Sequence, residues 1–252
     1  MADLLEKPVI VLVASLGVLW MSAWLGRWFS RGQKRDEGEA DDFTFVLGGT
    51  LTLLGLIIGF TFSMAVGRYD QRKSYEEQEA NAIGTEYVRA DLMPGVDGAR
   101  VRSLLRSYLD QRILYYTTRD AGPLHQIDSR TARLQAEMWS VAAAYGSAQQ
   151  TQVAALVVSG MNDVLNSQGY TQAAWWNRIP RGAWALMVAI AVFCNLLVGY
   201  GAHGRRAILF LILPIALSVT LFLIADIDSP RGGIIRVEPQ NLQALVESLR
   251  AQ

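Results

Sequence analysis

Small and hydroxyl-bearing side chains recur at helical spacing through one long apolar stretch of the chain, residues 43–66. Because successive members are three or four positions apart, they all lie on one narrow face of a helix. Glycines on such a face let a second helix of the same monomer pack closely. Around a pore, they would instead keep the lumen wide while hydroxyl oxygens replace the hydration shell of an ion. The spacing alone leaves both interpretations open. This stripe consists of Thr44, Gly48, Thr52, Gly55, Gly59 and Ser63.

Acidic residues prolong the stripe if the helix continues beyond the apolar stretch. Asp70, Glu77 and Asp91 follow it at multiples of seven residues from its last member. In a symmetric oligomer they would form negatively charged rings that favour cations. The alternative is a solvated helix surface, on which Arg72 and Lys73 pair with neighbouring acids within one turn. The glutamates concerned are Glu76, Glu77 and Glu79.

A second charged cluster follows the last apolar run of the chain and contains Asp226, Asp228 and Arg231. Two carboxylates beside an arginine could bind a cation or gate a pore. The alternative is structural, because Pro230 and the glycines after it end a helix and the charges then pair locally. We favour the structural interpretation.

Four apolar runs must position these residues. Each is about 20 residues long, which is the length needed to cross about 30 Å of hydrocarbon, and in lipid a single run must be helical. Tryptophans and arginines flank several of the runs, as expected at a membrane surface. The predicted transmembrane helices are 8–29, 43–66, 182–202 and 207–225.

Residues 67–180 form the predicted water-facing domain between the second and third spans. Its acids and bases are nearly balanced, its apolar residues follow helical spacing, and strand-like alternation is absent from it. Asp128 and Ser147 are the predicted N-caps of its third and fourth helices. A tail, 226–252, adds a short amphipathic helix that begins at Pro239. The predicted fold class is therefore all-α, with four transmembrane helices and a helical bundle between the second and third.

Several functional classes lack a signature in this chain. With a net charge of zero, no long-range field attracts nucleic acid. A single cysteine and two distant histidines offer no metal-ligand cluster, and neither a phosphate loop nor a Ser–His–Asp set is present. The expectation is a protein that is not an enzyme and holds no cofactor or metal.

The orientation in the membrane follows from the positively charged residues. Lys and Arg are slightly more numerous on the side that carries the large domain. We therefore predict a bacterial inner-membrane protein with the helical domain and both termini in the cytoplasm. The short loops Ser30–Asp42 and His203–Arg206 would face the other side.

Three segments of the sequence resemble a bacterial membrane family, the bestrophin-like domain family. The first is Gly59–Ala65 followed by Arg68-Tyr69-Asp70 and Arg72. The second is Glu79–Thr85 with Tyr87 and Arg89–Leu92, and the third is Asp226–Arg231 with Gly233–Val237. The family is distantly similar to bestrophins, which are pentameric anion channels whose second span lines the pore. The bestrophin aromatic neck motif and an acidic calcium-clasp segment are not found here. The resemblance implies a homo-oligomer, a pentamer by analogy, in a lipid bilayer with ions as its other partners. The leading hypothesis is an ion channel, and the alternative is a non-conducting scaffold or sensor whose helical domain recruits a partner.

Overall fold

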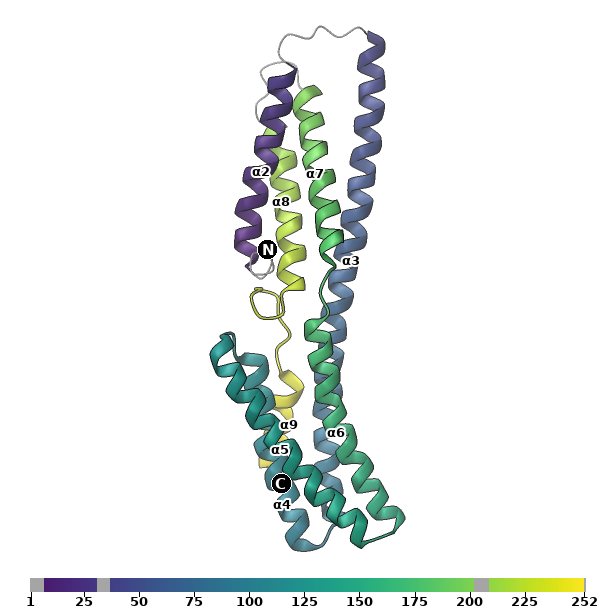
Figure 1. Cartoon of the computed structure of the whole chain (residues 1–252), viewed down its shortest axis with the longest axis vertical. Helices are drawn as coiled ribbons and strands as arrows, with labels where there is room; N and C mark the ends of the chain where they lie inside the picture. The colour runs from purple at the N-terminus through teal and green to yellow at the C-terminus, as the bar shows by residue number, and fades with distance from the viewer. Residues whose placement is uncertain (1–6, 31–36, 202–208, 252) are drawn as a thin grey trace. The chain divides into compact units, whose positions relative to one another are not determined.

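The computed structural model describes residues 7–30, 37–201 and 209–251, and every regular element in these ranges is helical (Figure 1). Four of the described helices are long and apolar enough to cross a membrane. The predicted all-α class with four spanning helices is therefore confirmed. The elements are α2 (Pro8–Phe29), α3 (Glu37–Arg89), the 3-10 helix η1 (Ala90–Leu92), α4 (Gly95–Thr117), α5 (Ala121–Ala148), α6 (Gln152–Trp176), α7 (Arg181–Gly201), α8 (Leu209–Asp228) and α9 (Gln240–Arg250).

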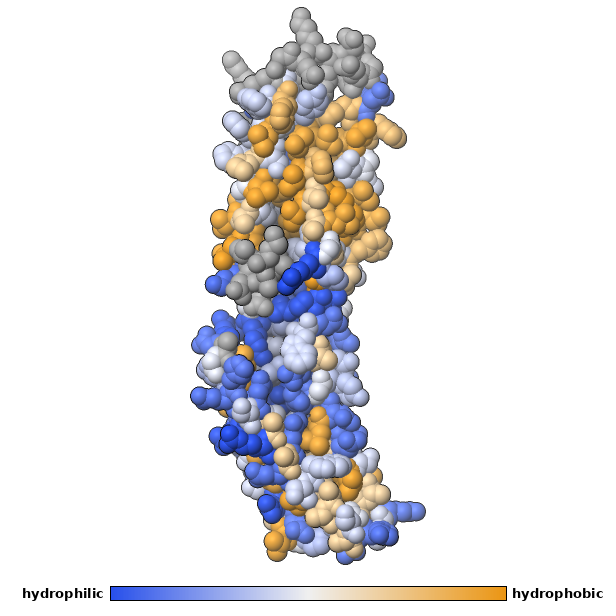
Figure 2. Space-filling model, viewed as in Figure 1, coloured by the Kyte–Doolittle hydropathy of each residue, from blue (hydrophilic) through white to orange (hydrophobic). Residues whose placement is uncertain are grey.

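The chain divides into two compact units. The first, called here the membrane unit, comprises Met1–Tyr69 and Arg178–Arg236. The second, called the polar unit, comprises Asp70–Asn177 and Val237–Gln252. Apolar side chains dominate the visible surface of the membrane unit and polar ones that of the polar unit (Figure 2). This difference matches a unit surrounded by lipid and a unit surrounded by water.

In the membrane unit, α2 packs along α7 and α8 (Figure 1). Two glycines permit this approach. A Cβ atom at Gly26 of α2 would overlap the carbonyl oxygen of Leu196 in α7, and one at Gly199 would overlap that of Ala23. These two positions form the small-residue contact that membrane helices use when their backbones meet.

Replacing Gly26 with alanine is expected to lower the thermal unfolding midpoint of the purified protein, because the added methyl group must push α2 away from α7. Such overpacking costs about 1–3 kcal/mol or more. The matched control is Gly17→Ala on the same helix, where a Cβ atom meets nothing within 4 Å among the described residues. Equal midpoints for the two variants would show that the helices do not cross at Gly26.

In the polar unit, α4 packs against α5 and α9, and α5 packs against α6. Side chains of the second half of α3 contact α4, α6 and α9. Buried apolar side chains from several of these helices form the core, among them Leu105 and Tyr108 of α4, Met138 of α5 and Met161 of α6. The tail helix α9 begins at Gln240 and buries Leu242 and Leu249.

The start of α5 corrects one sequence-based expectation and the start of α6 another. Helix α5 begins at Ala121, after Asp120, and not at the predicted cap Asp128. Gly122-Pro123 occupy its first turn, where proline needs no hydrogen-bonded N–H. Helix α6 is capped by Thr151, whose hydroxyl accepts a hydrogen bond from Ala154 N at 3.1 Å, and not by Ser147.

The loops on which the orientation was predicted lie largely outside the described residues. This holds for all of His203–Arg206 and for 31–36 within Ser30–Asp42. The orientation of the chain in the membrane therefore stays a prediction.

Candidate functional site

All six members of the predicted stripe lie on exposed positions of α3. At Gly48, Gly55 and Gly59, a Cβ atom would meet nothing within 4 Å among the described residues. These glycines therefore do not serve close helix packing within the monomer, which was one of the two interpretations of the stripe. The Thr52 hydroxyl donates to the carbonyl of Gly48 at 2.9 Å, so its oxygen still has lone pairs free to accept.

Packing within the chain falls on the other side of α3. Leu54, Thr61 and Ala65 are buried there, and Leu54 is only 2% exposed. The two apolar ones belong to one buried cluster with Met187 of α7 and Leu221 of α8. Thr61 donates its hydroxyl to the carbonyl of Ile57 at 2.8 Å, as helical threonines do in apolar surroundings. Because α3 packs on α7 and α8 through the side opposite to the stripe, the stripe stays exposed.

Large apolar side chains are exposed on α3 beside the stripe. Leu53, Phe60 and Met64 are the clearest examples, and Phe60 is 67% exposed. The exposed half of α3 therefore has two sides of different chemistry, one small and hydroxylated and the other bulky and apolar.

The acids that were expected to prolong the stripe separate in the structure. All three acids are exposed, but Asp91 lies in η1, beyond the end of α3, and forms an ion pair with Arg102. Gly84, between the last two in the heptad series, faces α9, where an added Cβ atom would lie 3.0 Å from Leu245 Cδ1. A straight helix of 3.6 residues per turn drifts by about 20° per heptad, so a seven-residue series leaves its starting face. Only the first two acids stay on the exposed side of α3.

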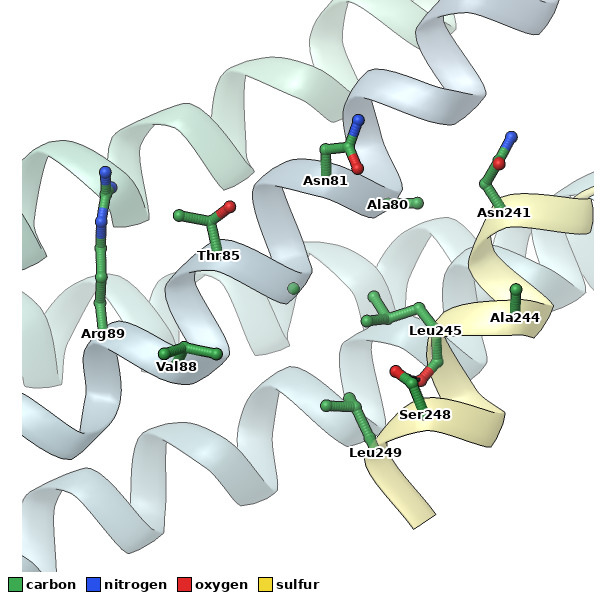
Figure 3. Close-up of a pocket in the computed structure, with 11 residues that line it drawn as sticks. Ala80, Asn81, Thr85, Val88, Arg89, Asn241, Ala244, Leu245, Ser248 and Leu249 are labelled. Carbon is green, nitrogen blue, oxygen red and sulfur yellow. Dashed lines mark hydrogen bonds between the residues drawn. The ribbon is translucent and has the colours of Figure 1, made fainter. Parts of the chain in front are cut away.

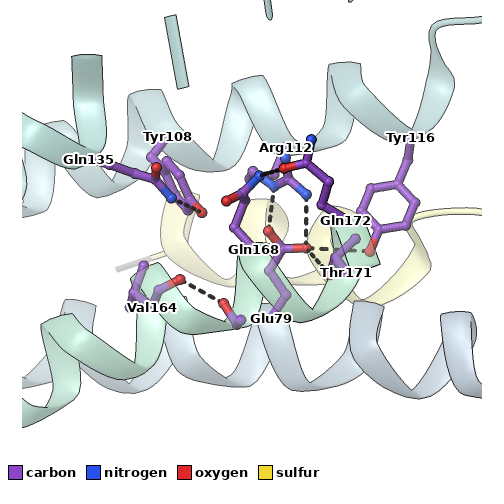
Figure 4. Close-up of polar contacts among 10 residues, drawn as sticks. Glu79, Tyr108, Arg112, Tyr116, Gln135, Val164, Gln168, Thr171 and Gln172 are labelled. Carbon is purple, nitrogen blue, oxygen red and sulfur yellow. Dashed lines mark hydrogen bonds and ion pairs between the residues drawn. The ribbon is translucent and has the colours of Figure 1, made fainter. Parts of the chain in front are cut away.

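A buried polar network joins three helices of the polar unit (Figure 4). The side chains of Glu79 on α3 and Arg112 on α4 are both fully buried and form a two-pronged ion pair. Glu79 Oε2 also accepts hydrogen bonds from the hydroxyl groups of Tyr116 at 3.3 Å and Thr171 of α6 at 3.1 Å. The guanidinium carbon of Arg112 lies 4.4 Å from the centre of the Tyr115 ring. This single carboxylate therefore ties α3, α4 and α6 together.

The Arg112 guanidinium stays charged in this network. Burial lowers the pKa of Arg112, but the Glu79 carboxylate outweighs it and holds the pKa above its ordinary value. Burial, together with the same carboxylate, raises the pKa of Tyr116, so its hydroxyl stays protonated and donates. Arg112 therefore stays a cation, and Tyr116 stays a hydrogen-bond donor, across the physiological pH range.

Sequence reasoning missed this network. Glu76 and Glu79 were expected on a solvated surface, yet both are buried. Glu76 accepts hydrogen bonds from Asn241 Nδ2 at 2.6 Å and from Leu242 N at 3.0 Å, at the start of α9. A carboxylate is favourable there because the first N–H groups of a helix lack partners. The spacing was the signal that could have found them. Residues 72, 76, 79, 83 and 86 continue, at helical spacing, the buried series 54, 61 and 65, to which the partly buried residue 58 also belongs.

Glu86 of α3 is the most unusual buried acid of the polar unit. Its side chain is fully buried, and neither carboxylate oxygen has a hydrogen-bond partner among the described residues. Arg89 Nη1 lies 3.9 Å away, and a Cβ at Gly160 of α6 would overlap the carboxylate. Burial raises the pKa of Glu86 to about 8, Arg89 opposes the rise, and Asp163 adds to it. At neutral pH this carboxyl is mostly protonated.

The stability of the polar unit should therefore fall as the pH rises. The folded state binds the Glu86 proton more tightly than the unfolded chain does, so the contribution of this group is fully present below pH 4.5 and is lost as the pH approaches 8. Glu86→Gln keeps a neutral side chain of the same shape and should raise the unfolding midpoint at pH 8 relative to the native protein, with little effect at pH 5. Exposed Glu77→Gln is the control. If the unfolding midpoint of Glu86→Gln depends on pH as that of the native protein does, Glu86 is not the cause of the loss of stability at high pH.

The charged cluster after α8 is engaged mainly by backbone groups. Asp226 accepts hydrogen bonds from the N–H groups of Ile234 and Ile235 at 2.7 and 2.8 Å. The Asp228 carboxylate accepts from Ile179 N at 3.1 and 3.2 Å and lies 4.0 Å from Arg68. Arg231 lies in the same turn and is partly exposed. This geometry supports the structural interpretation, because the carboxylate oxygens already have donors.

A groove of about 650 Å³ lies between α3 and α9 in the polar unit (Figure 3). Its floor contains the small residues Ala80, Gly84 and Ala244, with Leu245 beside them. Its walls carry the polar side chains Asn81, Thr85, Arg89, Asn241 and Ser248.

Comparison with known proteins identifies the family to which the chain belongs. The family model described as the Bestrophin-like domain matches residues 13–242. No match was found among curated proteins. A crystal structure of a bacterial bestrophin homolog from Klebsiella pneumoniae is 13% identical, covers 96% of this chain and 96% of its own, and superposes with a TM-score of 0.64. A point variant of that homolog is 12% identical, covers 96% and 97%, and gives a TM-score of 0.66. At such identities the likeness concerns the fold, whereas the family match extends over most of the sequence. The chain belongs to the Bestrophin-like domain family.

Proposed function

We propose that the protein is an oligomeric ion channel in which copies of α3 surround the pore. The observation that carries this proposal is the exposed stripe, whose glycines meet no neighbour among the described residues while the opposite side of α3 packs on α7 and α8. A membrane helix gains little from presenting glycine and threonine to lipid. The same face around an aqueous lumen gives width and oxygen ligands.

The two sides of the exposed half of α3 suit two roles in an oligomer. The small, hydroxylated side would face the symmetry axis. The bulky side, with Leu53 and Phe60, would pack against the neighbouring copy, where large apolar surfaces can be buried. By analogy with bestrophins the assembly would be a pentamer in the inner membrane, with the polar unit and both termini in the cytoplasm.

The remaining acids of the series would act on the permeating ion. Asp70 and Glu77 are exposed and lie farther along the same helix. Rings of carboxylates raise the local concentration of cations and lower that of anions. The buried network around Glu79 would hold the second half of α3 in place, so that these rings keep their position.

The test is the conductance of the purified protein in planar lipid bilayers, with reversal potentials measured in salt gradients. The proposal predicts channel currents, and it predicts that Asp70→Asn with Glu77→Gln shifts the reversal potential toward anions. Arg130→Gln with Arg133→Gln, two exposed positions on α5, is the control for a change of charge elsewhere. Silent bilayers from a protein that is monomeric in detergent would overturn the proposal and leave the scaffold alternative.

A further inference from the structure

The turn that follows α8 exposes two isoleucines in a fixed position. Ile234 is 75% exposed and Ile235 is 39% exposed. Their backbone N–H groups both donate to the Asp226 carboxylate. A Cβ atom at Gly233 would overlap the carbonyl oxygen of Asp226, so the chain can fold back this closely only with glycine there.

This fold-back sets the depth of the two isoleucines. Asp226 lies in the last turn of α8, which ends at Asp228 and is one of the four helices able to cross a membrane. Two short hydrogen bonds to Asp226 therefore hold Ile234 and Ile235 at the level of that turn. The end of a spanning helix is where the hydrocarbon meets the headgroups.

The charges that bracket the isoleucines are positive. Arg231 and Arg236 stand on either side of them in the sequence, and the Arg236 Nε is buried without a hydrogen-bond partner among the described residues. The Asp226 carboxylate accepts hydrogen bonds from the N–H groups of both isoleucines, and the Asp228 carboxylate accepts from Ile179 N and lies 4.0 Å from Arg68. Guanidinium groups match phosphate oxygens in geometry and charge.

We propose that the turn Arg231–Arg236 is a bilayer contact that recognises anionic phospholipids. Ile234 and Ile235 enter the boundary between headgroups and acyl chains, and the two arginines bind headgroup phosphates. Burial of apolar area combined with attraction to anionic lipid is the general basis of interfacial anchoring. A second copy of the chain is a less suitable occupant, because the flanking charges are both basic. The contact does not depend on ion conduction.

Spin-label accessibility tests the depth. The full chain with Cys194→Ala, which removes the single buried cysteine, carries a nitroxide at Ile234→Cys in phosphatidylcholine–phosphatidylglycerol vesicles. Oxygen, which concentrates in lipid, should relax this label more than a water-soluble nickel chelate does. A label at Val96→Cys, 84% exposed in the polar unit, should show the reverse order. Greater exposure of position 234 to the nickel chelate would overturn the proposal, and so would shielding from both reagents, which would indicate a protein contact.

Lipid-dependent stability tests the arginines. The unfolding midpoint of the native protein should be higher in nanodiscs that contain phosphatidylglycerol than in phosphatidylcholine alone. Arg231→Gln with Arg236→Gln should lose most of this difference. Arg130→Gln with Arg133→Gln removes the same amount of charge from α5. This double variant should keep the difference in unfolding midpoint between the two lipid compositions. If the first double variant keeps the full difference, the turn does not bind anionic headgroups.

Discussion

Replacing Ser63 with leucine is expected to lower the single-channel conductance about tenfold or more, with little change in the thermal unfolding midpoint. Ser63 is the last member of the stripe and is exposed. In a symmetric assembly, one leucine per copy would form an apolar ring that expels water, and a tenfold loss corresponds to a barrier of about 1.4 kcal/mol. Stability should be kept because the side chain touches no buried cluster of its own chain.

The neighbouring position provides the control for this experiment. Met64 is also exposed on α3 but lies on the bulky side, away from the stripe. Met64→Leu should leave the conductance within about twofold of native, because such a swap conserves volume and polarity. Equal conductance in the Ser63 and Met64 variants would mean that the stripe does not line the conduction path.

Replacing Arg112 with methionine is expected to lower the free energy of unfolding by about 3–5 kcal/mol, because the buried Glu79 carboxyl group then loses its cationic partner. Glu79→Met in the same chain should restore much of the loss, since removing both charges leaves no uncompensated ion. Restoration should be incomplete, because Tyr116 and Thr171 lose their shared acceptor. Denaturant titration of the purified variants measures these differences.

The exposed ion pair between Asp91 and Arg102 is the reference for that measurement. Its side chains are 62% and 32% exposed, so Arg102→Met should cost less than about 1 kcal/mol. A loss of similar size for Arg112→Met and Arg102→Met would show that the Glu79 network contributes no more than a surface pair.

The membrane unit was the more predictable part of the fold. Length and apolarity alone identify a spanning helix, so the four helices able to cross a membrane could be predicted. The spacing of the stripe also grouped its members on one side of α3. The spacing did not show which side of α3 packs on α7 and α8, because glycines are compatible both with close helix packing and with an exposed helix surface.

The polar unit was less predictable because its interactions join distant parts of the sequence. Glu79 pairs with Arg112 from α4 and with Thr171 from α6, 33 and 92 residues away. Local charge patterns suggested pairs within one turn of α3, which are equally compatible with the sequence. The burial of Glu86 likewise depends on Gly160, whose missing side chain leaves room for the carboxylate.

Chemical modification of single cysteines tests most directly whether the stripe lines an ion path. In a Cys194→Ala background, a charged thiosulfonate reagent should reduce the current through Thr52→Cys channels, because position 52 would face the lumen. The same reagent should leave Ile57→Cys channels unchanged, because Ile57 packs against the buried cluster of the membrane unit. Full block at position 57 with no effect at position 52 would contradict the placement of α3 around the pore.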